Sequence, residues 1–258
     1  MPAPPANVLA AFRASARPEP LSGGQATAWR AGDVVLKPLD MSVEALGWQA
    51  EVLGSMACDD FRVAPPLRTR GGELVVDGWT AWPMLAGAHA PRWAEIVAVG
   101  ERFHRALAGV GRPTAVLDAR MDAWARADRI AWGEQPADGL ERVPEVAHLL
   151  AVRTAVSAPN QVIHGDLSGN VLFADGRAPA VIDLSPYWRP MEYASAIVMV
   201  AAVLWYGAEV GLLSVVGDAQ LLVRALLFRL LATPDPAAAV DGYRRAIGFA
   251  DGLLDERG

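Results

Sequence analysis

The sequence predicts an α+β protein of two lobes, a β-rich first lobe and a mainly helical second lobe. Short strand-like runs separated by turn residues fill the first third of the chain. From residue 93 onwards most segments have helical spacing of apolar residues, with a few short apolar β-type runs near the middle. We therefore expect a first lobe at residues 1–86, including an N-terminal arm, and a second lobe at residues 87–258.

The first lobe is expected to contain several strands and one well-defined helix after a short helical patch at residues 8–16. Ser42 is placed to cap that helix, which continues to about residue 56 because apolar residues recur there at helical spacing. Gly71 and Gly72 form a turn between the last two strands. The strand-like runs cover residues 27–30, 34–36, 61–65, 67–70 and 73–82.

The second lobe is expected to be helical around one hairpin. Asp175 and Gly176 form the turn of that hairpin, between strands ending near residue 173 and beginning near residue 180. Residues 193–208 carry no charge, but the run is shorter than the ~20 residues that a membrane span needs, so a buried helix is favoured. The expected helices cover residues 93–108, 118–132, 145–156, 193–207, 209–233 and 236–254.

Composition excludes several classes of protein. A net charge of −6, without a run of basic residues, argues against a general nucleic-acid binder. The single Cys58 cannot form an intramolecular disulfide, which fits a cytoplasmic protein. The first residues lack the pattern of a signal peptide, and we expect no membrane insertion. The sequence leaves the oligomeric state open.

Two segments near the middle of the chain carry the chemistry. The segment 162–173 reads VIHGDLSGNVLF, which places Asp166 and Asn170 on a short loop between apolar runs. The segment 181–186 reads VIDLSP, which places Asp183 at the end of another β-type run. One carboxylate can take the proton of an attacking hydroxyl, while amide and carboxylate oxygens suit Mg²⁺ bound to phosphates. This layout predicts phosphoryl transfer.

Lysine usage points the same way. Of the 23 basic side chains only Lys37 is a lysine, and the remainder are arginines. A lysine kept against this bias indicates a place where a compact ammonium group is needed. Contact with nucleotide phosphates is such a place. The alternative is chance survival at an exposed strand end.

The motifs resemble those of the aminoglycoside phosphotransferase and choline kinase-like family, which has a bilobal protein-kinase-like fold. A closer likeness is to a largely actinobacterial subgroup with the same HGDLSGNVLF and IDLSPYWRP segments. The resemblance implies Mg²⁺-dependent transfer of the γ-phosphate of ATP or GTP to a hydroxyl of a small molecule. It makes Asp166 the general base and Asn170 and Asp183 the metal ligands. Lys37 would contact the phosphates and pair with Glu51, although Glu44 on the same expected helix is a competing partner.

The resemblance also implies the remaining site residues. Ser22, Gly23 and Gly24 would form the phosphate-covering turn, and the N–H of Met84 would bind adenine. His164 would pack and hydrogen-bond beneath the loop of Asp166. The acceptor would meet a tentative set of four residues after the metal-binding acid, namely Tyr187, Trp188, Arg189 and Glu192.

The length of the loop after Asp166 and the composition of the acceptor site keep alternatives open. Asp166 and Asn170 are four residues apart, whereas the family usually has five. Together with a sparse acceptor site, this shorter loop favours a rival interpretation, a catalytically impaired nucleotide-binding or interaction protein. A third alternative is a membrane-associated helical protein. The run 193–217 offers only Glu209 as an acid, so a sugar, amino sugar or amino alcohol is a better acceptor than a polycationic antibiotic.

Overall fold

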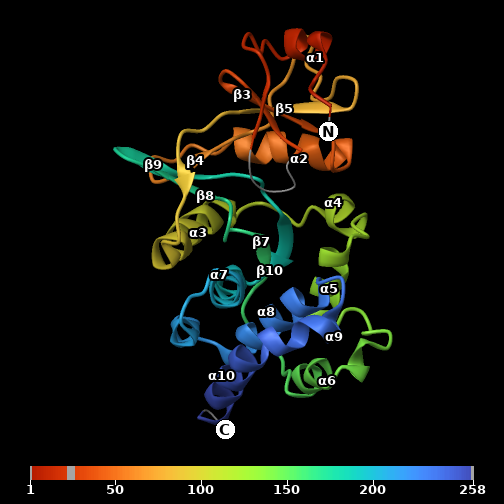
Figure 1. Ribbon diagram of the computed structural model, residues 1–258, viewed down its shortest axis with the longest axis vertical. Coiled ribbons are helices and arrows are strands. Elements are labelled where there is room, and N and C mark those ends of the chain that lie inside the picture. Colours follow the sequence, from red (N-terminus) through yellow and green to blue (C-terminus); the bar gives the residue numbers. More distant parts are fainter. Residues whose placement is uncertain (1, 22–26, 257–258) are drawn as a thin grey trace. The chain divides into compact units, whose positions relative to one another are not determined.

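The computed structural model describes residues 2–21 and 27–256 (Figure 1). The chain forms two compact units, each discontinuous in sequence. Unit 1 consists of Met1–Ala90 and Asn170–Leu184, and unit 2 of Pro91–Gly169 and Ser185–Gly258. The fold is α+β, with its sheets mainly in the N-terminal part and its helices mainly in the C-terminal part, which confirms the predicted fold class.

The first sheet of unit 1 is antiparallel and has the order β1-β2-β3-β5. Gly32, with φ of +67°, forms the tight turn between β2 and β3. One face of the sheet packs against α1 (Ala6–Ala11) through Val8 and Phe12. The strands are Glu19–Pro20 (β1), Trp29–Ala31 (β2), Val34–Pro38 (β3) and Trp79–Pro83 (β5).

The predicted helix after Ser42 is confirmed as α2 (Val43–Gly54). The Ser42 hydroxyl accepts a hydrogen bond from the N–H of Ala45, which satisfies one of the free donors of the first turn. Leu46 is fully buried and packs with Leu74 and Trp82. Packing of this apolar face fixes α2 within unit 1.

The second sheet of unit 1 has the order β4-β9-β8-β6, with β4 parallel to β9. The predicted hairpin at Asp175 and Gly176 is confirmed as β8 and β9, and Gly176 has φ of +66° as the turn requires. The strands are Arg62–Val63 (β4), Ala88–His89 (β6), Val171–Ala174 (β8) and Arg177–Val181 (β9).

The predicted pair of strands at residues 67–70 and 73–82 is wrong. Residues 67–70 form no strand, and only Trp79–Pro83 of the second run is extended in a sheet. Gly72 has φ of +94° and lies in the predicted turn, but Gly78 also has a positive φ, of +76°, so the chain turns again inside the run where one continuous strand was expected.

Unit 2 is built on buried helices. Every residue of α8 is buried, and α8 packs against α5, α7 and α10. The predicted helix 118–132 corresponds to α5, which begins only at Ala123 because Asp122 caps its start, and the separate helix α4 ends at Asp118. The α-helices are Trp93–Leu107 (α3), Thr114–Asp118 (α4), Ala123–Ala131 (α5), Pro144–Ala151 (α6), Met191–Trp205 (α7), Ala219–Leu231 (α8), Pro236–Ala239 (α9) and Arg244–Asp255 (α10).

The remaining elements of unit 2 are one small sheet and three short helices. Strands β7 (Gln161–His164) and β10 (Pro186–Arg189) pair antiparallel, with His164 opposite Pro186. The 3-10 helices are Leu140–Arg142 (η1), Val210–Val215 (η2) and Val240–Gly242 (η3). Within the described part of the chain, none of the helices has both the length and the apolar character that crossing a membrane requires.

Candidate functional site

The loop that carries Asp166 follows β7 and is held by two histidines. Nδ1 of His164 accepts a hydrogen bond from the N–H of Asp166 at 3.1 Å. The N–H of His164 in turn donates to Nε2 of His104 at 3.0 Å. His164 is fully buried, which confirms the predicted packing beneath the loop. The Asp166 carboxylate itself is 48% exposed, so the loop is fixed from below while its acid faces solvent.

His104 serves as a neutral acceptor. Burial, assisted by the neighbouring His164, lowers the pKa of His104 to about 3. A neutral imidazole has one ring nitrogen free to accept, and the bond from the His164 N–H needs that acceptor at Nε2. His104 therefore supports β7 in the state that prevails at neutral pH.

Two glycines allow side chains to approach this loop. A Cβ at Gly165 would lie 2.5 Å from the ring of Tyr187, and one at Gly100 would lie 2.6 Å from Leu167. Both distances are below any normal carbon contact, so neither position has room for a side chain unless a buried neighbour moves. Gly165 also donates its N–H to the carbonyl of Ser185 at 2.9 Å.

Asn170 and Asp183 lie at the same end of the β8–β9 hairpin in unit 1. Val171 pairs with Val181, and the N–H of Ile182 donates to the carbonyl of Asn170 at 3.0 Å. Asp183 has φ of +51°, in the left-handed region that non-glycine residues rarely occupy. This backbone turn comes two residues after the end of β9 at Val181, and the Asp183 side chain is 47% exposed.

Lys37 on β3 forms an ion pair with Asp183. Its ammonium group also lies 5.0 Å from the ring centroid of Trp82, a cation–π contact. Glu51, the partner expected from the sequence, is exposed, and no hydrogen bond or ion pair to its side chain occurs among the described residues. Glu44 is likewise exposed.

The residue of α2 that reaches this region is Gln49, which sequence reasoning missed. Its side-chain amide donates to the carbonyl of Leu184 at 3.0 Å, and the side chain is 2% exposed. The sequence could have indicated Gln49, because it lies three residues after Leu46 and so on the buried face of the helix. A polar side chain there needs a hydrogen-bond partner.

The oxygen donors at the hairpin end fit a divalent cation such as Mg²⁺. Asp183 supplies a carboxylate, which lies next to the positively charged ammonium group of Lys37, and Asn170 supplies an amide oxygen. No cluster of three or more acidic, histidine or cysteine side chains suited to a metal occurs in the described residues. Two protein ligands with phosphate and water are a usual set for Mg²⁺, so the donor set remains suitable.

Two further predicted groups bear on nucleotide binding. Ser22, Gly23 and Gly24 lie outside the residues that the structure describes. The N–H of Met84 donates to the carbonyl of Asp33 at 2.8 Å. Adenine could use this donor only if the bond to Asp33 were released.

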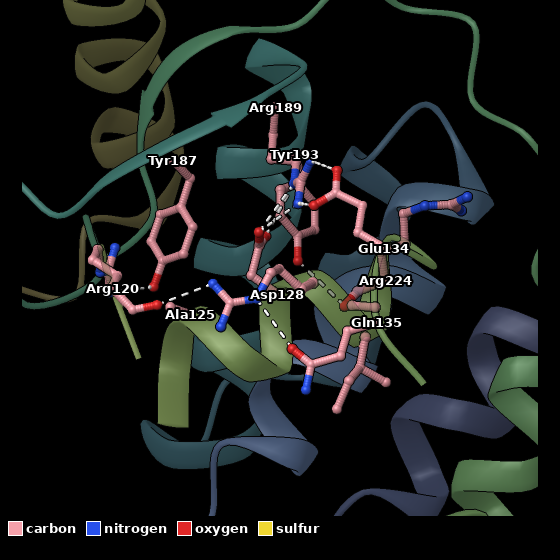
Figure 2. A network of polar contacts seen from close by, with 12 residues as sticks. Arg120, Ala125, Asp128, Glu134, Gln135, Tyr187, Arg189, Tyr193 and Arg224 are labelled. Carbon is pink, nitrogen blue, oxygen red and sulfur yellow. Dashed lines mark hydrogen bonds and ion pairs between the residues drawn. The ribbon is translucent and has the colours of Figure 1, made fainter. Parts of the chain in front are cut away.

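Of the predicted acceptor residues, Arg189 has the most extensive contacts, and Figure 2 shows them. Its three guanidinium nitrogens donate to Asp128 and Glu134 over 2.6–3.2 Å. Burial alone would lower the pKa of Arg189, but the bonds to Glu134 and Asp128 raise it overall. Arg189 is thus a fixed cation inside unit 2, occupied by two carboxylates.

The other predicted acceptor residues differ in exposure. Tyr187 is buried, and its hydroxyl accepts a hydrogen bond from Arg120 at 3.2 Å (Figure 2). Burial raises the pKa of Tyr187 to about 12, so the hydroxyl stays neutral. Trp188 is partly exposed, and Glu192 is exposed in the first turn of α7. Only these last two offer surface to a ligand.

Arg229 was also missed from the sequence. It lies on α8, is 2% exposed, and donates to Oδ1 of Asp166 at 3.2 Å. The sequence could have indicated this residue, because an arginine inside the otherwise apolar run LLFRLL is expected to be buried. A buried cation needs a partner of opposite charge.

Comparison with known proteins gives one family match. The model of the phosphotransferase enzyme family matches residues 19–187. This range contains Lys37, Asp166, Asn170 and Asp183. No curated protein sequence matches the chain.

Solved structures with the same fold include three small-molecule kinases. A spectinomycin phosphotransferase in complex with ADP and spectinomycin is 12% identical, with a TM-score of 0.52 over 89% of this chain and 88% of that one. An amicoumacin kinase in complex with AMP-PNP, Ca²⁺ and Ami is 14% identical, with a TM-score of 0.57 over 91% and 88%. A choline/ethanolamine kinase family protein from Mesorhizobium loti is 19% identical, with a TM-score of 0.52 over 96% and 90%.

Proposed function

Because this chain belongs to the phosphotransferase enzyme family, we propose that it transfers the γ-phosphate of ATP or GTP to a hydroxyl of a small molecule in the cytoplasm. The observation that carries the proposal is the arrangement at the end of the β8–β9 hairpin. There Asp183 pairs with the single lysine of the chain, and Asn170 begins the hairpin. Solved structures of the same fold contain ADP or AMP-PNP, which supports a nucleotide co-substrate.

Asp166 is the general base in this proposal. Its carboxylate orients the acceptor hydroxyl and takes its proton as the acceptor oxygen bonds to the γ-phosphorus. The bond from that phosphorus to the bridging oxygen breaks, and the nucleoside diphosphate leaves with this oxygen. The loop bonds to His164 hold the base in place, so little reorganisation is needed.

Asn170 and Asp183 are the proposed ligands of Mg²⁺, which would neutralise phosphate charge when bound. Lys37 contacts the phosphates, which requires its ammonium group to share Asp183 with the cation or to leave it. Glu51 stays a possible second partner for Lys37, and Trp188 and Glu192 are the proposed acceptor contacts with exposed surface.

Calorimetric titration of ATP and GTP tests the proposal, with and without Mg²⁺, on wild type, Asp183→Asn and Asp166→Asn. Asparagine tolerates the left-handed backbone at position 183, so that variant removes charge without adding backbone strain. We expect Mg²⁺-dependent binding in wild type and Asp166→Asn, and its loss in Asp183→Asn. Phosphate transfer to a panel of sugars, amino sugars and amino alcohols should be lost in both variants.

The rival interpretation is a catalytically impaired binding protein, which the short spacing between Asp166 and Asn170 favours. Nucleotide binding that is indifferent to Mg²⁺ and to Asp183→Asn would support this rival and overturn the assignment of the metal site.

A further inference from the structure

Arg229 combines features that are unusual for a buried arginine. Its side chain is 2% exposed and lies on α8, a helix whose residues are all buried. Among the carboxylates of the described residues, only Asp166 forms an ion pair with it, at 3.2 Å. Its Nε is buried without a hydrogen-bond partner in the described structure. Burying a cation with one half-exposed partner is a poor source of stability, which points to a role at Asp166.

Aromatic rings hold the guanidinium group in place. Its central carbon lies 4.6 Å from the ring centroid of Trp205, 5.4 Å from that of Trp124 and 5.5 Å from that of Phe228. Aromatic faces attract a cation and restrict its movement. Arg229 is therefore a fixed charge, whereas a surface arginine would be free to turn away.

The other two arginines that are buried in the described part of unit 2 have partners of a different kind. Arg189 pairs with two carboxylates, of which Asp128 is buried. Arg224, also on α8, donates to Gln220 and to the carbonyl of Thr154, which are neutral groups. Of these three described arginines, Arg229 is the one that donates to the residue proposed as the general base.

The surroundings of this ion pair include exposed aromatic surface. Trp205, Tyr206 and Trp124 are 47%, 45% and 37% exposed, respectively. A Cβ at Gly169, three residues after Asp166, would lie 3.7 Å from the Tyr206 hydroxyl. Exposed aromatic rings beside a hydroxyl-activating acid provide faces on which the ring of an acceptor can lie.

We propose that Arg229 is a positioning residue for Asp166 and that its charge, by balancing the Asp166 carboxylate, keeps this centre from favouring amines over neutral ring hydroxyl compounds. The inference rests on the proposed function, because it assumes that Asp166 meets the acceptor. Without Arg229, the Asp166 carboxylate would attract a cationic group near the reacting hydroxyl, whereas the ion pair has no net charge with which to attract it.

The test compares wild type with Arg229→Met, Arg229→Lys and the control Arg224→Met. The acceptors are matched sets with one ring, such as glucose, glucosamine and glucuronate, and further triplets of this kind. Methionine replaces a buried cation by an apolar chain of similar length, so Arg229→Met should remain folded, which circular dichroism checks.

We expect wild type to use the amine no better than the neutral member of a triplet, within about threefold in kcat/KM. Arg229→Met should lower kcat by about 30-fold or more with unchanged affinity for Mg²⁺ and ATP, and should shift the acceptor preference towards the amine, because the Asp166 charge is then unbalanced. Arg229→Lys should keep the wild-type acceptor preference but not the full kcat, because an ammonium group balances the charge but lacks the planar fork. Arg224→Met should leave kcat per folded molecule unchanged.

Three results would overturn the inference while leaving the proposed function intact. These are a wild-type preference for the amine, a kcat of Arg229→Met within threefold of wild type, or an equal loss of kcat in Arg224→Met. If no triplet is phosphorylated, the assay measures hydrolysis of ATP instead, with water as the acceptor. Arg229→Met must then lower the rate of hydrolysis as Asp166→Asn does. An enzyme that transfers phosphate to neither sugar nor water refutes the proposed function and this inference together.

Discussion

Gly165 is the residue at which the loop of Asp166 has least room. Its missing side chain leaves space for the ring of Tyr187, which is buried and hydrogen-bonded to Arg120. The sequence shows a glycine next to the acid, but the physical reason for it lies in the side chain of Tyr187, 22 residues further along the chain. Such a reason depends on the pairing of β7 with β10, which a motif does not reveal.

We expect Gly165→Ala to destabilise the protein by about 1–3 kcal/mol, because a methyl group forces a buried ring to move. Chemical denaturation measures this change, and the rate of phosphate transfer should fall with it. Gly248→Ala is the control, since that glycine is exposed on α10 with nothing within 4 Å of an added Cβ. Equal stability of wild type and Gly165→Ala would show that the loop adapts freely.

His104 makes stability depend on pH. Its pKa is about 3 in the folded protein and about 6.5 in an unfolded chain. Between these values the unfolded chain binds a proton that the folded protein does not. The contribution of His104 to the free energy of unfolding therefore has its full value above pH 6.5. It falls as the pH drops towards 3, by up to ~1.4 kcal/mol per pH unit.

His104→Gln keeps a hydrogen-bond acceptor for the His164 N–H but cannot take up a proton. We expect its unfolding free energy to differ from that of wild type by a constant amount above pH 7 and to depend less on pH between 6 and 4. Urea denaturation at a series of pH values measures both. If the unfolding free energies of wild type and His104→Gln changed with pH in parallel over the whole range, His104 would not be the group responsible for the pH dependence.

At the scale of elements, α2 shows what hydropathy patterns do and do not predict. Ser42 and the apolar spacing that follows it predict the helix and its buried face. The same pattern cannot say which helix residue lies near Asp183. The sequence pointed to Glu51, which is exposed, whereas the structure has Lys37 paired with Asp183 and Gln49 bonded to Leu184. Polar side chains on a helix find partners through tertiary contacts that local spacing does not encode.

We expect Gln49→Met to weaken nucleotide binding. The change leaves the carbonyl of Leu184 without its donor, at a cost of about 1–3 kcal/mol in stability, and loosens the segment that holds Asp183. Calorimetry should therefore give a weaker affinity for Mg²⁺ and ATP. Glu44→Gln, an exposed change on the same helix, is the control and should bind as wild type does. Unchanged affinity in Gln49→Met would separate this contact from the nucleotide site.

At the scale of the whole molecule, composition and motif order predicted the α+β class and the phosphotransferase family. They could not predict that Asn170–Leu184 belongs to unit 1, because strand partners far away in sequence decide it. Strand β9 pairs with β4, and β8 pairs with β6, so this segment joins the N-terminal part of the chain. A single division of the sequence cannot represent a unit of two segments. Asp166 thus belongs to unit 2, while Asn170 and Asp183 belong to unit 1.

The stabilisation of the folded chain by a bound nucleotide should therefore distinguish the role of Asp166 from that of Asp183. A nucleotide that binds only the folded state adds ~2.7 kcal/mol when its concentration is 100 times its dissociation constant, which raises the melting temperature by roughly 5–10 °C for a chain of this length.

We expect Mg²⁺ with AMP-PNP to produce this shift in wild type and in Asp166→Asn but not in Asp183→Asn, because only the last variant loses a proposed metal ligand. Differential scanning calorimetry at matched ligand concentrations measures the shifts, and AMP-PNP without Mg²⁺ is the control. If Asp183→Asn were stabilised as much as wild type, the cation would have to be bound elsewhere. If Asp166→Asn lost the shift as well, Asp166 would contribute to nucleotide binding, and its role as a base acting only in transfer would be wrong.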